Sequence, residues 1–423
     1  MKKGLKTRLA DGSVLASRRR LRRSPSWAEL GAGTAVGVIA SKQTNRRLLA
    51  IALVGFCSFL NLYTTQPLLP LFTQIFQASK VEVSLTVSAT TIAVALAAPW
   101  AGALADSLGR KRVIVPALLL LAVPTLLAAT APGLSSLIAW RFGQGLIMAV
   151  IFAVSLAYVS EEWAGAGISA AMSIYITGNV IGGFSGRFLA GLVADALGWR
   201  WMFGLLGGVT LLGGIIVWAW LPSSRHFVRK TSIRQSLSAI RSHLKNPRLI
   251  AAYAVGFNVL FSMVAIFTYV TFYLSAAPFR LSSAALGSIF CVYLFGAVIT
   301  PLAGRWIGQL GYRQSLFWAI ATVSTGVLLT LVPRLGVVIA GLSISAFGTF
   351  ICQAVATSYV GTTVQASRSS ATGLYVAFYY LGGSLGAIIP GLAWGVGQWP
   401  ACVALVLGVQ AVTVYLAIAF WKK

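Results

Sequence analysis

Apolar residues along the chain gather in runs of about 20, separated by short polar or glycine-containing stretches. A helix of that length crosses a bilayer and pairs its own backbone groups, whereas the alternation typical of membrane β-strands is not seen. The pattern therefore predicts an all-α membrane protein with twelve transmembrane helices, over residues 48–70, 83–105, 112–130, 134–158, 168–193, 201–221, 249–275, 284–307, 315–332, 335–357, 370–394 and 400–421.

The second half of the chain repeats the first. The run Val-Gly-Phe at 54–56 recurs at 255–257, and the Gly-Gly pair at 182–183 recurs at 382–383, with offsets of 201 and 200 residues. Such a parallel repeat predicts two pseudo-symmetric six-helix bundles around an axis along the membrane normal. We expect these bundles to span residues 48–221 and 248–423.

Two further segments lie outside the bundles. Residues 1–47 contain twelve Lys or Arg and two acids, which is typical of a disordered basic tail. Residues 222–247 form a linker in which Ile233, Leu237, Ile240 and Leu244 share one helical face, and this predicts an amphipathic helix on the inner leaflet.

Composition and charge support the membrane class. The chain is 58% hydrophobic and only 9% charged, which excludes an ordinary soluble fold. Segments on the side of the N-terminus hold 27 Lys or Arg, against 4 in the opposite loops. This bias predicts that both termini are cytoplasmic. The membrane is expected to be a bacterial inner (plasma) membrane. The basic tail is then expected to meet anionic lipids of the inner leaflet, and no nucleic acid is expected as a partner.

The sequence contains no motif that indicates an enzyme. The four Cys and two His have no metal-binding or disulfide spacing, and no phosphate-binding Walker loop is present. No combination of nucleophile and base stands out. We therefore expect neither an enzyme nor a bound metal or cofactor, with the proton gradient as the energy source.

Three motifs carry a family resemblance. Residues 102–112 (Gly-Ala-Leu-Ala-Asp-Ser-Leu-Gly-Arg-Lys-Arg) closely resemble the signature loop of the major facilitator superfamily, and residues 141–145 (Arg-Phe-Gly-Gln-Gly) resemble its second motif. Residues 63–70 are similar to the end of the first span in sugar-efflux (arabinose-efflux-like) and multidrug-efflux permeases. The resemblance implies a monomeric carrier of a small-molecule solute that works by alternating access around a central cavity.

The loop motif predicts a conformational latch. Asp106 is placed to cap the start of the eleventh span while pairing with Arg110, and the resemblance implies that this stabilises the outward-facing state. A solvated basic loop is the alternative. Glu161 and Glu162 either join the latch in a charge relay or only solubilise a helix end. The full latch set is Gly102, Asp106, Gly109, Arg110, Lys111, Arg112, Glu161 and Glu162.

Two arginines fall within predicted spans, where a charge is costly and often functional. Arg141 shares a helical face with Gln144, which suits a cavity wall, and the resemblance implies substrate binding or proton coupling. Its alternative is a side chain that reaches the outer interface. Arg187, near the outer end of the fifth span, is expected to reach the interface, to pair with Asp195 or to contact substrate.

Glycines in the fifth span form a separate motif. Gly178, Gly182, Gly183 and Gly186 are similar to the antiporter motif of proton-coupled exporters, but Gly183 stands where that motif has Pro. The motif indicates efflux by antiport, while close helix packing is the alternative.

Uncharged polar and aromatic side chains form stripes along several spans. They suit a cavity for sugars or amphipathic aromatic solutes, although hydrogen bonds between helices would also explain them. No acidic residue lies in the middle of a span, so proton coupling must use groups at the membrane edge or the proton of the solute. The complete substrate and coupling set is Asn61, Tyr63, Gln66, Arg141, Gln144, Asn179, Arg187, Asn258, Gln353, Tyr375 and Tyr379.

These observations predict a secondary active transporter. The preferred hypothesis is proton-linked efflux of a small sugar-like or amphipathic solute. A carrier or facilitator of organic anions that uses Arg141 and Arg187 is the alternative. A non-transporting membrane receptor or scaffold is a third class, and it differs by requiring residues 1–45 for function.

Overall fold

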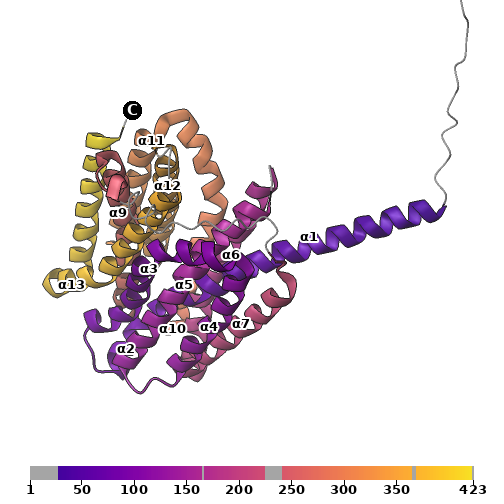
Figure 1. Cartoon of the computed structure of the whole chain (residues 1–423). Helices are drawn as coiled ribbons and strands as arrows, with labels where there is room; N and C mark the ends of the chain where they lie inside the picture. Colours follow the sequence, from indigo (N-terminus) through magenta and orange to yellow (C-terminus); the bar gives the residue numbers. More distant parts are fainter. Residues whose placement is uncertain (1–26, 164–165, 224–240, 364–367, 422–423) are drawn as a thin grey trace, which may run out of the picture. The chain divides into compact units, whose positions relative to one another are not determined.

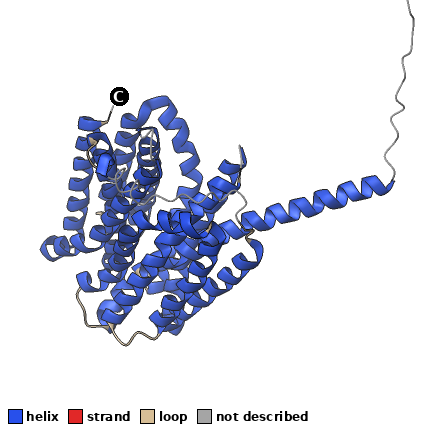
Figure 2. Ribbon diagram, viewed as in Figure 1, coloured by secondary structure: helices blue, strands red, loops and turns tan. Residues whose placement is uncertain are grey.

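The computed structural model describes residues 27–163, 166–223, 241–363 and 368–421, with side chains described from residue 45 onward except at 102–108, 166, 169, 296–306 and 368–369. Every regular element in these ranges is helical (Figure 2). The chain divides into two units, Met1–Asn45 and Arg46–Lys423. Most of the predicted linker helix, at 224–240, lies outside the described residues.

Helix α1 spans Trp27–Leu62 and so begins inside the segment for which we expected disorder. That expectation rested on the arginines before residue 24 and the cations at 42–47. The uncharged stretch at 30–41 contains three glycines, which are poor helix formers, and the helix nevertheless runs through it. Residues 1–26 lie outside the described residues.

The amino-terminal bundle continues after α1 with short and long helices. These are η1 (Gln66–Leu68), α2 (Leu69–Ile75), α3 (Lys80–Leu108), α4 (Arg110–Ala129), α5 (Leu134–Glu162), α6 (Ala166–Leu197) and α7 (Trp199–Trp220). Gly109 and Gly198 have φ values of 89° and 95° and join consecutive helices without a longer loop. A side chain is unfavourable in that backbone region, which explains glycine at both turns.

The carboxyl-terminal bundle consists of α9 (Pro247–Ser275), α10 (Ser283–Ile289), η2 (Phe290–Tyr293), α11 (Leu294–Leu329), α12 (Leu335–Thr363) and α13 (Arg368–Phe420). Two of these helices are interrupted. The backbone is non-helical at Gly311 within α11, and at Gly397 and Gln398 within α13. Each therefore contains two separate membrane-crossing segments.

These interruptions explain why the helices are fewer than the predicted membrane spans. In the described residues, nine helices are long and apolar enough to cross a membrane, and the one at Ser370–Phe420 has 51 residues. A span needs only about 20 residues, so this helix supplies two spans. The series α10, η2 and the start of α11 supplies another, and the rest of α11 supplies the next. The described chain thus contains the twelve predicted crossings.

Helices within each half pack side by side. Figure 1 shows α4 beside α5 and α7, and α11 beside α12. The glycines of the fifth span mediate one such contact, because a Cβ at Gly178, Gly182 or Gly186 would meet the backbone of α1. In the other half, Gly382 and Gly386 approach the backbone of α9 in the same way. The glycine motif therefore serves close helix packing in both bundles.

We name the two ends of the unit by residues that lie there. The Lys80 face carries the start of α3, the turn at Gly198 and the start of α10, and the Arg110 face carries the turns at Gly109 and Gly311. Helices that run in alternating directions connect the two faces.

Candidate transport site

Arg187 of α6 lies in the seam between the two bundles and is only 4% exposed. Its Nε donates to Oε1 of Gln66 at 2.7 Å, and its Nη1 donates to the carbonyl oxygen of Gly183 at 2.6 Å. Three aromatic rings surround the guanidinium carbon, at 4.7 Å for Tyr63, 5.0 Å for Phe290 and 4.9 Å for Tyr293. We call these four partners, Tyr63, Gln66, Phe290 and Tyr293, the Arg187 cage.

The cage draws on both halves of the chain. Tyr63 and Gln66 lie where α1 ends and η1 begins, whereas Phe290 and Tyr293 form the ends of η2. Gln66 also donates through Nε2 to Oγ1 of Thr268 on α9 at 3.1 Å. The cage thus forms where a span in each half departs from regular α-helix, and this departure directs side chains into the seam.

The positive charge of Arg187 is not matched by a carboxylate in the described part of the chain. All seven acids precede residue 196 in the sequence, so the carboxyl-terminal half contains none. Asp195, the acid nearest in sequence, is exposed and forms no ion pair in the described residues, so the expected Arg187–Asp195 pair is not made. Neutral dipoles and aromatic faces alone surround the cation, and a buried cation is costly without a counter-charge.

One edge of the guanidinium is available. Among the described residues, no hydrogen bond is formed by Nη2 of Arg187, although Nε and Nη1 are both used. A carboxylate or another oxyanion is the chemical partner that such an edge prefers. The site can therefore accept an anion without first breaking the hydrogen bonds that hold the arginine.

Aromatic rings extend along the seam from the other spans. Tyr375 and Tyr379 of α13 stack with centroids 5.9 Å apart, and Tyr380 lies 6.2 Å from Phe152 of α5. The hydroxyl of Tyr375 is buried and has no hydrogen-bond partner in the described residues. Flat apolar faces with few free polar atoms are typical of sites for amphipathic ligands.

Arg141 occupies a different environment. It is fully buried, and its guanidinium donates to the carbonyl oxygens of Asn61, Leu62 and Thr86 at 2.6, 2.6 and 3.0 Å. The oxygens of Asn61 and Leu62 belong to the last turn of α1, where carbonyl groups lack partners within the helix. Arg141 therefore caps the end of α1 and joins it to α3.

The residues beside Arg141 complete an internal network. Gln144 accepts from Arg141 Nη1 at 2.5 Å and donates to Thr125 at 2.9 Å, while Asn61 donates to Thr210 at 2.8 Å. These partners all belong to the amino-terminal bundle. The polar atoms of Arg141, Gln144 and Asn61 join α1, α3, α4, α5 and α7 in a buried network, and the expected role of Arg141 and Gln144 in a cavity wall stays a prediction.

The remaining predicted residues are distributed over both bundles. Asn258 donates to Thr413 at 2.9 Å beside a cavity of about 20 Å³, and Gln353 is half-buried on α12. Asn179 lies against α1, where a Cβ at Gly55 would meet its side-chain oxygen. Of the eleven predicted substrate and coupling residues, Tyr63, Gln66 and Arg187 form one site, and Tyr375 and Tyr379 form the stacked pair on α13.

The seam is closed next to Arg187 on the side of the Lys80 face. A Cβ at Gly191 would meet the carbonyl oxygen of Ser283, and one at Gly287 would lie 2.7 Å from the carbonyl oxygen of Arg187. Helices α6 and α10 thus touch through their backbones one turn beyond the cage. At the same face, Lys80 lies over the rings of Phe272 and Trp394, with Nζ 5.8 and 5.4 Å from their centroids.

At the Arg110 face, an ion pair joins α4 to α5. Arg110 is 5% exposed and contacts Glu161 through Nη2–Oε1 at 2.6 Å and Nε–Oε2 at 3.0 Å. Lys111 is half-buried and Arg112 is exposed. The surroundings of Gly102 and the side chain of Asp106 are not among those described, so the latch through Asp106 stays a prediction.

Sequence reasoning missed three residues of the site, namely Thr268, Phe290 and Tyr293. All three lie within long apolar runs, where a threonine or an aromatic residue is unremarkable. Phe290 and Tyr293 lie three residues apart in η2 and both face Arg187. The sequence contains no glycine or proline at the change from α10 to η2 that would have marked it.

Comparison with known proteins agrees with this architecture. A family model described as Major Facilitator Superfamily matches residues 51–387. An "Uncharacterized transporter" of Buchnera aphidicola subsp. Schizaphis graminum is 32% identical over 383 residues, which cover 90% of this chain and 93% of the relative. The "Inner membrane transport protein YnfM" of Escherichia coli is 32% identical over 379 residues, covering 87% and 91%.

A solved structure shares the fold at low identity. It is the crystal structure of a bacterial homolog to the human lysosomal transporter Spinster, in the inward-facing and occupied conformation. Its TM-score is 0.72 at 16% identity, and the match covers 88% of this chain and 96% of that one. The chain therefore belongs to the Major Facilitator Superfamily and is a multi-pass membrane transporter rather than an enzyme.

Proposed function

We propose that this transporter exports a small amphipathic organic anion, and that Arg187 is the counter-charge of the transported solute. The observation that carries the proposal is the buried guanidinium of Arg187, which lies in the seam with three aromatic rings, one unused edge and no carboxylate partner in the described residues. This arrangement supports the organic-anion alternative of the sequence analysis over a sugar-like solute.

The chemistry of the cage supports an aromatic carboxylate. A carboxylate placed at Nη2 would form a charge-assisted hydrogen bond, which is stronger than a neutral one. The ring of the same molecule would lie against tyrosine faces such as Tyr379 and Tyr380. A sugar would need many free hydrogen-bonding groups, but Asn61, Gln66 and Gln144 already use theirs inside the protein.

The bias of Lys and Arg supports a cytoplasmic Arg110 face, with both termini on the cytoplasmic side of the inner membrane. The Lys80 face is then periplasmic. The backbone contact of Gly191 with Ser283 would close the periplasmic entrance to Arg187. In alternating access, a site closed toward the periplasm exchanges its solute with the cytoplasm, and this is the loading step of an export cycle.

The membrane potential would drive this export without a proton site in the protein. An anion that leaves a cell with a negative interior gains about 2.3 kcal/mol per 100 mV. The pair of Arg187 with the anion is neutral, which lowers the cost of carrying the charge through the seam. Proton antiport, expected from the glycine motif, would add to this driving force through groups at the membrane edge or through the solute.

The test uses the purified full-length protein in liposomes that contain a pH dye and a potential-sensitive dye. The panel consists of an aromatic carboxylate, its uncharged amide, a pentose and a lipophilic cation. We expect flux of the carboxylate alone, and its rate should rise when the imposed potential is made more negative on the side from which it leaves. Flux of the pentose without the carboxylate would contradict the proposal. Proton movement with the carboxylate would add antiport or symport to it.

A further inference from the structure

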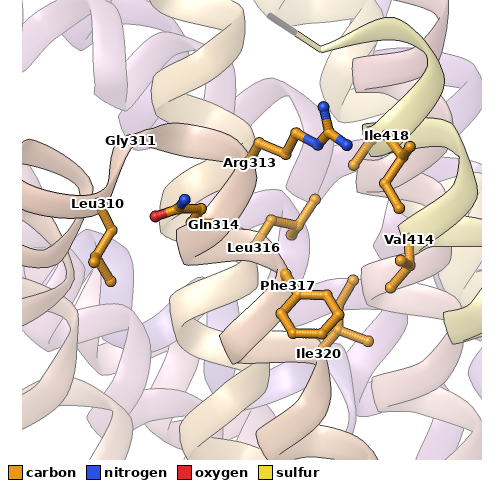
Figure 3. Close-up of a pocket in the computed structure, with 10 residues that line it drawn as sticks. Leu310, Gly311, Arg313, Gln314, Leu316, Phe317, Ile320, Val414 and Ile418 are labelled. Atoms are coloured by element: carbon orange, nitrogen blue, oxygen red, sulfur yellow. The ribbon is translucent and has the colours of Figure 1, made fainter. Parts of the chain in front are cut away.

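One cavity among the described residues lies away from Arg187. It measures about 390 Å³ and opens between the second half of α11 and the end of α13, at the Arg110 face (Figure 3). Its lining is apolar except for two side chains. The lining residues are Leu310, Gly311, Arg313, Gln314, Leu316, Phe317, Ile320, Val414, Ala417 and Ile418.

This groove faces the surroundings of the bundle rather than the seam. Phe317 is 49% exposed and Ile418 is 50% exposed, and the neighbouring Trp318 is 60% exposed. In a protein that spans a membrane, large apolar side chains with this exposure meet lipid. The occupant of the groove is therefore expected to come from the bilayer.

The polar end of the groove carries a single cation. Figure 3 shows Arg313 with its guanidinium extending toward the end of α13, above Phe317 and Ile320. Arg313 forms no hydrogen bond or ion pair with another described residue, and its half of the chain contains no Asp or Glu at all. No Asp or Glu side chain of that half can therefore serve as its counter-charge.

The internal repeat shows that the carboxyl-terminal half lacks the ion pair found at the corresponding turn of the amino-terminal half. The turn Gly109-Arg110-Lys111 corresponds to Gly311-Tyr312-Arg313 at an offset of 202 residues. Where Arg110 pairs with Glu161, Tyr312 instead packs its ring edge-on against Tyr359 at 5.5 Å. The carboxyl-terminal half has therefore replaced the internal ion pair by an aromatic contact, and has kept a cation at the groove.

We propose that this groove binds one anionic phospholipid, with an acyl chain along Leu316, Phe317 and Val414 and the phosphate at Arg313. An apolar channel that ends in one cation matches a molecule with an apolar chain and a negative headgroup, and basic groups at this level of a membrane attract such headgroups. The site is independent of the solute proposed for Arg187.

The test is native mass spectrometry of the full-length protein, released from nanodiscs that contain equal amounts of phosphatidylglycerol and phosphatidylethanolamine. Two variants address the two parts of the site. Arg313→Gln removes the charge, and Val414→Trp fills the apolar channel while leaving the charge. Arg334→Gln is the matched control, because Arg334 is an exposed arginine of the same half at the opposite face.

We expect wild-type protein and Arg334→Gln to retain one phosphatidylglycerol preferentially, and Arg313→Gln to lower that retention about fivefold. Val414→Trp should lower it as well. Equal retention by Arg313→Gln and Arg334→Gln would overturn the proposal, since the lipids would then be bound through charge in general. Equal thermal stabilisation by inorganic phosphate and by phosphatidylglycerol would also overturn it, because a free anion would then suffice.

Discussion

Gln66 accepts a hydrogen bond from Nε of Arg187 at 2.7 Å and donates one to Oγ1 of Thr268 at 3.1 Å. The two bonds connect α6 to the turn after α1 and then to α9, so one amide side chain spans the seam. An amide can perform both roles because it carries an acceptor and a donor. Gln66 therefore orients Arg187 without neutralising it, and this leaves the charge available to a solute.

The first prediction concerns the effect of a negative charge at position 66. Gln66→Glu places a carboxylate beside Arg187 with almost no change in shape, and it should weaken binding of an aromatic carboxylate by at least about tenfold, since the counter-charge is then already present. Gln66→Leu removes the hydrogen bonds but keeps Arg187 uncompensated, so it should weaken binding much less. Titration calorimetry of both variants measures the difference, and equal loss in the two would refute a role for charge.

The second prediction concerns Arg141, whose guanidinium caps carbonyl groups of Asn61, Leu62 and Thr86. Arg141→Ala removes the guanidinium donor from all three oxygens and leaves those of Asn61 and Thr86 with only the longer bonds from Thr64 and Thr90, and we expect it to lower the free energy of unfolding by about 3 kcal/mol. Thermal unfolding in detergent checks this, with Arg141→Lys as an intermediate case. Wild-type stability together with lost transport would instead make Arg141 a substrate ligand.

The pair formed by Arg110 and Glu161 gives the third prediction. Reversing either charge should slow transport, because each variant leaves one group of a partly buried pair next to a like charge. The double reversal, Arg110→Glu with Glu161→Arg, should recover part of the rate, with a coupling of about 1 kcal/mol in a double-mutant cycle. Strictly additive losses would show that the two residues act separately.

Asp106→Asn should also slow transport while membrane insertion is retained, as the predicted latch requires.

The fourth prediction tests closure at the Lys80 face. A leucine at Gly191 cannot fit against the backbone of Ser283, so Gly191→Leu should hold α6 and α10 apart. Spin labels at positions 192 and 284 should then report a longer distance between α6 and α10. Transport by the same variant should be slower. Gly204→Leu is the control, because a Cβ at Gly204 meets no atom within 4 Å. An unchanged distance in Gly191→Leu would show that this contact does not control closure.

Much of the fold followed from the sequence, since span length, glycine spacing and the repeat each reflect a constraint that acts locally. Ser79 and Glu82, at the start of α3, have the spacing of a capping box, and both of its hydrogen bonds are present. The roles of the buried polar residues could not be predicted from the sequence. Asn61 and Arg141 are 80 residues apart, and no local pattern indicates that one caps the helix of the other.

The site was predictable only in part for the same reason. Arg187 stood out because a charge within a span is costly, and Tyr63 and Gln66 stood out as part of a polar stripe. Their convergence depends on where α1 and α10 leave the regular α-helix. Their convergence also depends on how the two bundles meet, because Tyr63 and Gln66 come from one half of the chain and Phe290 and Tyr293 from the other.

The measurement that tests the central claim most directly is flux of an aromatic carboxylate into liposomes that contain wild-type protein, Arg187→Gln, Arg187→Lys or the control Arg200→Gln. Arg200 lies at the Lys80 face, where it donates to the carbonyl oxygen of Ala131, so its loss removes a cation outside the seam. We predict that Arg187→Gln abolishes flux, that Arg187→Lys retains a fraction of it, and that Arg200→Gln transports at the wild-type rate. Wild-type flux in Arg187→Gln would contradict the assignment of Arg187 as the counter-charge of the solute.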